Sequence, residues 1–185
     1  MREQAVRKRI LWGAVLMVGA AACAAMKNTS VWGVYPIGRG ISNGLIFACL
    51  LAAVRWSGWQ AAGVIGMIVP MQLWGMRLLD GFMVPVDIMT NLVLIAGMHL
   101  VLKRSWKYWN AVLFLTAAAF CATNLGSTAA IWLVKRESVA RAMLLAWNTT
   151  LFSLFSVLGA SAICVPFERR RLGDRGTENP EEESL

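Results

Sequence analysis

The sequence predicts an all-α integral membrane protein, a bundle of six transmembrane helices. Of its 185 residues, 58% are hydrophobic, a share well above that of soluble domains. Apolar runs close to the roughly 20 residues that cross a bilayer recur along the whole chain. We expect no separate soluble domain. Residues 1–9 form a basic N-terminus, residues 10–167 form the membrane domain, and residues 168–185 form a charged tail that we expect to be disordered.

The first span is expected at residues 10–26, an apolar run rich in alanine and glycine. Small residues recur there at four-residue spacing, which lets another helix approach closely, either a partner protein or a neighbour in the same chain. These residues are Ala20, Ala21, Ala24 and Ala25. The basic start and the AACAAM end also resemble a cleavable signal peptide, but the run is long for one and further spans follow. A polar loop is expected at residues 27–37.

The next three spans are expected at residues 38–54, 58–79 and 82–102. Asn43 lies about one turn inside the second span. Pro70 lies near the middle of the third span and should kink it, because proline removes one backbone hydrogen bond. Pro85 falls in the first turn of the fourth span, where proline is tolerated.

The last two spans are expected at residues 110–134 and 139–167. The fifth is long and becomes polar at residues 123–128, TNLGST, so we expect that it ends early or breaks there.

The distribution of basic residues predicts the orientation. Six spans place twelve of the 18 lysines and arginines on the side of both termini, and the side richer in basic residues is cytoplasmic. These twelve are Arg2, Arg7, Lys8, Arg9, Arg55, Lys103, Arg104, Lys107, Arg169, Arg170, Arg171 and Arg175. The expected location is therefore the cell membrane, with both termini in the cytoplasm.

Polar residues are concentrated around the beginning of the fourth span. Arg77 and Asp80 suit a water-exposed turn equally well, but Asp87 and Asn91 lie deeper and at i, i+4 spacing on one helical face. Charged groups at that depth are costly and are usually functional. We expect an outward-open, aromatic-walled cavity that binds a small molecule, lined by Asn43, Trp74, Arg77, Asp87 and Asn91. The alternative is that Asp87 pairs with Arg77 only to hold two helices together.

Motifs for catalysis and metal binding are absent from the sequence. It has no Gly-rich phosphate loop, no HExxH and no GxSxG with a partnering histidine and aspartate, and its four cysteines form no CxxC pair. We therefore expect no catalytic residues, no metal site, no cofactor and no nucleic-acid partner. Active transport by such a chain needs a partner or an ion gradient as its energy source.

Three motifs occur in a characteristic order: GRGISNGL opens the second span, GWQAAGVIGMIVPMQLWG forms the third, and VPVDIMTN opens the fourth. Over residues 10–167 this combination resembles the substrate-binding S components of energy-coupling factor (ECF) transporters. It is most similar to a branch whose fourth span carries a proline-to-asparagine motif, although Asp87 stands where an apolar residue is expected.

The resemblance implies a membrane subunit that binds a vitamin or similar micronutrient from outside. Such a subunit docks on a transmembrane coupling protein with two ATPase subunits and topples in the bilayer to release its cargo. The family docks through small residues of the first helix, which points to Ala20, Ala21, Ala24 and Ala25. Two other hypotheses stay open: a small membrane enzyme or accessory subunit that uses Arg77, Asp87 and Asn91, and a structural membrane subunit.

Overall fold

The computed structural model describes residues 2–29, 36–75, 81–104 and 106–165. Within these residues the secondary structure is entirely helical. The helices are α1 (Arg2–Thr29), α2 (Pro36–Trp56), α3 (Trp59–Gly75), the short 3₁₀ helix η2 (Gly81–Met83), α4 (Val84–Lys103), α5 (Tyr108–Lys135) and α6 (Val139–Cys164). An all-helical fold is therefore confirmed.

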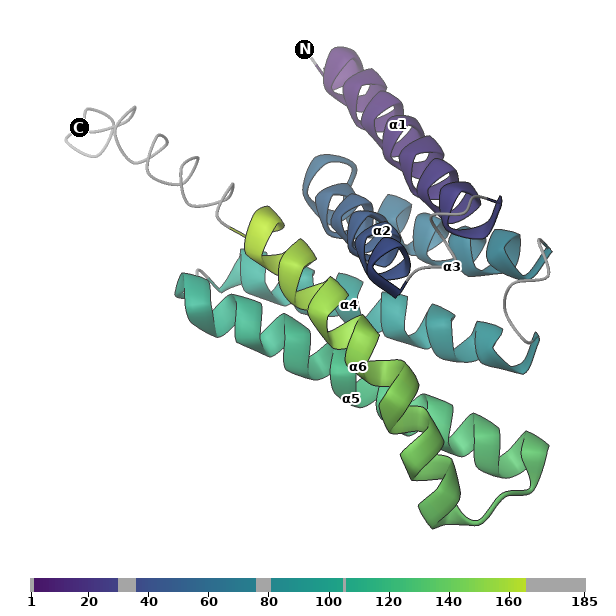
Figure 1. The fold of residues 1–185 in the computed structure, drawn as a ribbon. Helices are drawn as coiled ribbons and strands as arrows, with labels where there is room; N and C mark the ends of the chain where they lie inside the picture. The colour runs from purple at the N-terminus through teal and green to yellow at the C-terminus, as the bar shows by residue number, and fades with distance from the viewer. Residues whose placement is uncertain (1, 30–35, 76–80, 105, 166–185) are drawn as a thin grey trace.

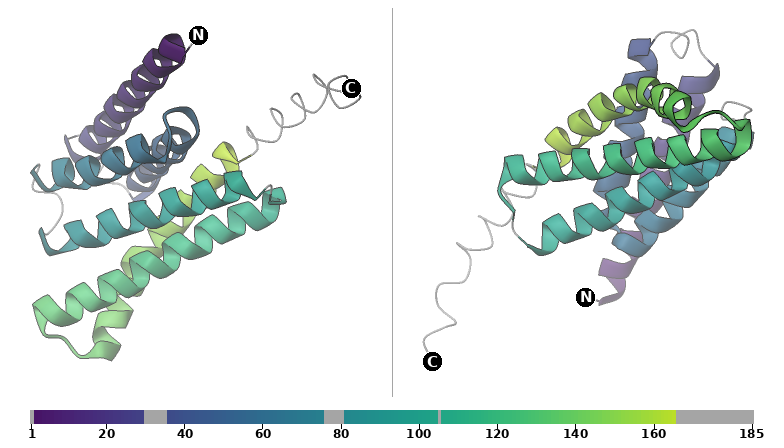
Figure 2. Two further views of the ribbon diagram at one scale, coloured as in Figure 1. Left: turned by 180° about the vertical axis from the view of Figure 1, so that it is seen from behind. Right: turned by 90° about the horizontal axis from the view of Figure 1, so that it is seen from below.

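The six α-helices form one antiparallel bundle with α2 at its centre. Helix α2 contacts α1, α3, α4 and α6, while α5 packs against α4 and α6. Successive helices run in alternating directions, so the start of α1 and the end of α6 lie toward the same end of the bundle (Figures 1 and 2). The start of α4 lies at the other end, together with the α5–α6 turn.

Four helices are long and apolar enough to cross a membrane: Glu3–Lys27, Ile37–Trp56, Gly81–Lys103 and Tyr108–Lys135. The described part of α3 has 17 residues, and the apolar stretch recognised in α6 is Ser153–Cys164. The structure thus supports a membrane protein, and the count of six spans stays a prediction.

Close approach between helices depends on glycine in the bundle interior. A Cβ added at Gly44 of α2 would lie 3.5 Å from the carbonyl oxygen of Ser156 in α6. One turn earlier on α2, the Gly40 carbonyl accepts a hydrogen bond from Ser156 Oγ at 2.9 Å. The two backbones therefore cross closely enough for a side chain of one helix to bond the backbone of the other.

Helix α3 continues through Pro70, and a residue of α4 compensates for the proline. Because Pro70 has no N–H, the carbonyl of Gly66, four residues earlier, has no donor within its own helix. Asn91 Nδ2 donates to this carbonyl at 3.0 Å. The Asn91 side chain is only 5% exposed, so the hydrogen bond is made inside the bundle.

Gly66 also makes this contact sterically possible. A Cβ at Gly66 would lie 3.1 Å from Ile95 Cδ1 and 3.2 Å from Asn91 Cβ, both on α4. Such distances are tighter than ordinary van der Waals contact, so Ile95 and Asn91 would have to shift by a few tenths of an ångström. Gly66, Pro70 and Asn91 therefore act as one structural unit that fixes α3 against α4.

The expected break in the fifth span is wrong, because α5 is continuous from Tyr108 to Lys135. Thr123 Oγ1 donates to the Ala119 carbonyl at 2.8 Å, and it also lies 3.1 Å from Thr90 Oγ1 of α4. A threonine hydroxyl that bonds its own helix leaves the backbone hydrogen bonds in place. Thr123, the first residue of the polar run 123–128, is thereby accommodated without interrupting the helix.

The expected loop at residues 27–37 is also too long. Helix α1 continues through Lys27 to Thr29, and α2 already begins at Pro36. The predicted kink at Pro70 stays a prediction. The expected disorder of residues 168–185 falls outside the described residues.

We predict that Asn91 and Pro70 are energetically coupled. Asn91→Leu, which is nearly isosteric but lacks the donor, should lower the free energy of unfolding by about 1–3 kcal/mol, because the buried Gly66 carbonyl is left unpaired. In a Pro70→Ala background the same change should cost much less, because the alanine N–H at that position can bond the carbonyl. Denaturant unfolding of the four proteins in detergent measures the coupling. Equal costs in both backgrounds would contradict it.

Candidate functional site

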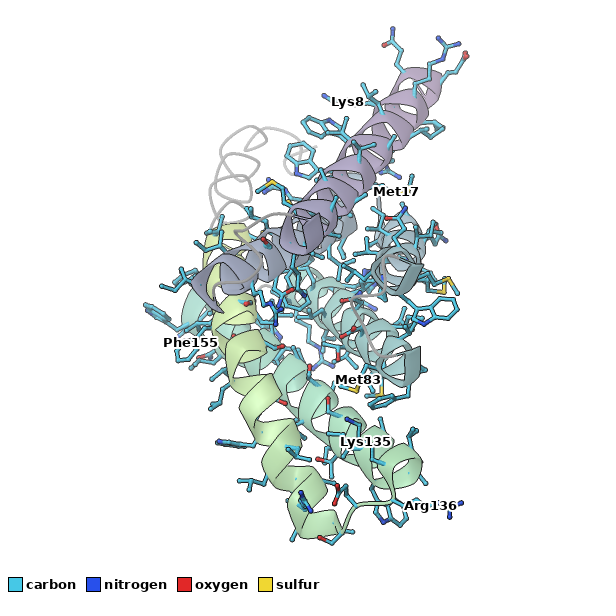
Figure 3. All side chains as sticks on the ribbon, turned by 45° about the vertical axis from the view of Figure 1, so that its right-hand side comes forward. Lys8, Met17, Met83, Lys135, Arg136 and Phe155 are labelled. Atoms are coloured by element: carbon cyan, nitrogen blue, oxygen red, sulfur yellow. The ribbon has the colours of Figure 1, made fainter. Side chains whose placement is uncertain are left out.

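Polar side chains from three helices lie near one another close to the end of α1. Lys27 lies in the last turn of α1, Asn43 in α2 and Asp87 in the first turn of α4, and all three are half-buried. Lys27 Nζ donates to Asn43 Oδ1 at 2.8 Å. We call Lys27, Asn43 and Asp87 the polar cluster. It belongs to the end of the bundle opposite Lys8, the end at which Met83 and Arg136 are seen (Figure 3).

The polar cluster contains charges of both signs. Lys27 of α1 attracts Asp87 of α4, and Arg39 of α2 repels Lys27. No ion pair within 4.0 Å joins Lys27 to Asp87 in the described part of the chain. Lys27 and Asp87 therefore interact over a longer distance and are not in direct contact.

The residues expected to bind substrate do not all lie in the polar cluster. Asn43 and Asp87 belong to the polar cluster, and Asn91 lies one turn deeper on α4, about 6 Å along the helix axis from Asp87. The donor of Asn91 is engaged by the Gly66 carbonyl. Trp74 is 56% exposed and lies against Gly81, where an added Cβ would come within 2.7 Å of its Nε1. Trp74 therefore faces outward and does not wall the polar cluster.

Arg77 falls outside the described residues. Its expected role in binding substrate and its expected pairing with Asp87 therefore stay predictions.

Lys27 is the residue that the sequence interpretation missed, because it was placed in a loop. The helical spacing could have found it. Ala20, Ala24 and Lys27 lie at i, i+4 and i+7, which is one face of a helix. Ala20 and Ala24 are completely buried in the core, and Lys27 continues the same face into the polar cluster.

The burial of Ala20 and Ala24 also bears on their expected role in partner docking. These two residues have no exposed surface and pack against helices of the same chain. This agrees with the alternative that the small residues of the first span allow a neighbouring helix of the same chain to approach. Ala21 and Ala25 are partly exposed, so a docking role on α1 stays a prediction for them.

Further polar atoms are buried in α5 near the same end of the bundle. Asn124 Nδ2, Ser127 Oγ and Thr128 Oγ1 have no hydrogen-bond partner in the described part of the chain.

In the described residues, no group of three or more histidine, cysteine or acidic side chains is placed to hold a metal ion. The arrangement can therefore offer one cation, one carboxylate and neutral amides to a small polar molecule.

Comparison with known proteins returned no match: no family model, no curated protein and no solved structure matches this chain.

Proposed function

We propose that this chain is the substrate-binding subunit of a membrane uptake system, an S component of an ECF-type transporter. Its ligand would be a vitamin or similar micronutrient bound at the polar cluster. The observation that carries the proposal is a half-buried lysine and a half-buried aspartate that lie near each other inside an apolar bundle without direct contact.

This arrangement is costly unless something binds to it. Placing a charge in an apolar interior costs several kcal/mol, and a direct ion pair with good geometry offsets much of that cost. Lys27 instead donates to the neutral amide of Asn43. A small molecule with an acidic group for Lys27 and a basic or hydrogen-bond-donating group for Asp87 would compensate both charges at once. The polar cluster thus favours a zwitterionic or strongly polar ligand.

The proposal includes partners, because the sequence has no ATPase motif. A transmembrane coupling protein and two ATPase subunits would supply the energy, and the chain itself would catalyse no reaction. The structural-subunit hypothesis finds support in Asn91. Its side-chain amide donates a hydrogen bond that holds α3 against α4. The Lys27–Asn43 hydrogen bond also joins α1 to α2, so the polar cluster needs a direct test.

We predict that Asp87→Asn reduces ligand retention by about one to two powers of ten, the effect of losing a charged hydrogen bond of about 1.5–3 kcal/mol. The melting temperature should change little, because the substitution is nearly isosteric. Native mass spectrometry of the purified protein measures the retained small molecule. Glu3→Gln, an exposed acidic residue on α1, is the matched control and should retain as much as the wild type. Unchanged retention with a large drop in melting temperature would show that Asp87 is structural.

We predict that the tagged protein copurifies with a transmembrane partner and ATPases. Ala21→Trp should weaken this copurification while leaving the protein folded, because Ala21 is partly exposed. Ala20→Trp should instead destabilise the protein, because overpacking a completely buried site costs about 1–3 kcal/mol. Recovery of the pure chain without ATPases, under conditions that preserve membrane complexes, would argue against an ECF-type subunit.

We predict six spans with both termini in the cytoplasm. A cytoplasmic reporter fused after Leu185 should be active. A cysteine at Ser138, an exposed residue before α6, should react with a membrane-impermeant reagent added outside the cell, in a background without the four native cysteines. Labelling of a C-terminal cysteine from outside would overturn this topology.

A further inference from the structure

A depression of about 560 Å³ lies at the turn between α4 and α5, at the opposite end of α4 from the polar cluster. Its lining combines a cation, an amide and apolar groups: Trp106, Lys107, Asn110 and Leu113. The proposed function makes no use of this surface.

The walls of the depression are held in place by contacts behind it. The Trp106 ring packs on Phe114 of α5, with ring centroids 4.7 Å apart. Tyr108 Oη donates to the Ala162 carbonyl at 3.2 Å, which ties the start of α5 to the end of α6. The depression is therefore a preformed feature of the bundle.

The surroundings of the depression are strongly basic. Lys103 and Arg104 are exposed at the end of α4, and Lys107 is exposed where α5 begins. The sequence contains no aspartate or glutamate anywhere in residues 88–136. Asp87, the acidic residue of α4, lies at the opposite end of that helix, so an anionic group is attracted to this end of the α4–α5 pair without acidic competition nearby.

The face of α5 that leads away from the depression changes from polar to apolar. Lys107, Asn110, Leu113, Ala117 and Cys121 follow one another at spacings of three or four residues, and all five are exposed. Residues at this spacing share one face of a helix. The two residues at its deeper end, Ala117 and Cys121, have small side chains. The surface thus begins with hydrogen-bond donors and continues as an apolar track toward the middle of the span.

We propose that this surface binds one anionic phospholipid. The phosphate lies against Lys107 and Asn110, the headgroup region packs on Trp106, and one acyl chain follows Leu113 and Ala117. Charge complementarity selects an anionic over a zwitterionic lipid, because a basic residue near the bilayer surface attracts anionic headgroups. The order of polar and apolar residues along α5 matches a lipid and does not match a free phosphate, which would gain nothing from the apolar track.

The test compares phosphatidylglycerol with phosphatidylcholine on the detergent-solubilised full chain by native mass spectrometry. The wild type should retain phosphatidylglycerol preferentially. Lys107→Gln should weaken that retention about fivefold, the effect of one basic contact near the bilayer surface. Lys8→Gln is the matched control, an exposed lysine on α1 that does not line the depression, and should change nothing. Equal retention of the two lipids, or equal loss in the two variants, would overturn the proposal.

A second variant separates a lipid site from a simple anion site. Leu113→Asn places a polar group in the path of the acyl chain but keeps every charge. It should weaken retention of phosphatidylglycerol, and glycerol 3-phosphate at millimolar concentration should not displace the lipid. Unchanged retention in Leu113→Asn, or displacement by glycerol 3-phosphate, would show that the surface recognises only a phosphate. Because Leu113 is 60% exposed, the change should not disturb the core.

Discussion

The arrangement of the bundle depends on one hydrogen bond, from Asn91 of α4 to the Gly66 carbonyl of α3. Pro70 leaves that carbonyl without a donor in its own helix, and an unpaired carbonyl in an apolar interior costs about 1–3 kcal/mol. Asn91 removes this cost and fixes the rotation of α4 about its axis. Because Asp87 lies four residues earlier on the same face, the rotation that directs Asn91 toward α3 also directs Asp87 into the bundle.

The other side of the polar cluster depends on small residues in α1. Ala20 and Ala24 are completely buried, which lets α1 approach α2 closely enough for Lys27 to reach Asn43 at 2.8 Å. Larger side chains at these positions would move α1 outward and expose Lys27 to lipid. The same alanine face that suggested a docking surface therefore explains how a lysine can be held inside the bundle.

Composition and apolar periodicity were sufficient to predict the helical class and the approximate helix positions, because burial in lipid demands long apolar runs. They failed at polar residues inside the helices. The first span was ended before Lys27 because a charge looks like a boundary, and residues 123–128 were read as a break because the hydroxyl–carbonyl bond of Thr123 is invisible in the sequence. Pro70 and Asn91 were both singled out, but their connection requires knowing that α4 faces the carbonyl four residues before the proline.

Helix α4 joins two chemically different ends of the molecule. Its beginning carries Asp87, half-buried and near an ammonium group that it does not touch, while its end carries Lys103 and Arg104 exposed at the surface. A buried charge acts strongly on its few neighbours, because little water screens it, whereas exposed charges act weakly on any one partner and are screened by salt. The first arrangement suits selection of one small molecule inside the bundle. The second suits contact with a lipid headgroup at the membrane surface, so binding at one end need not disturb the other.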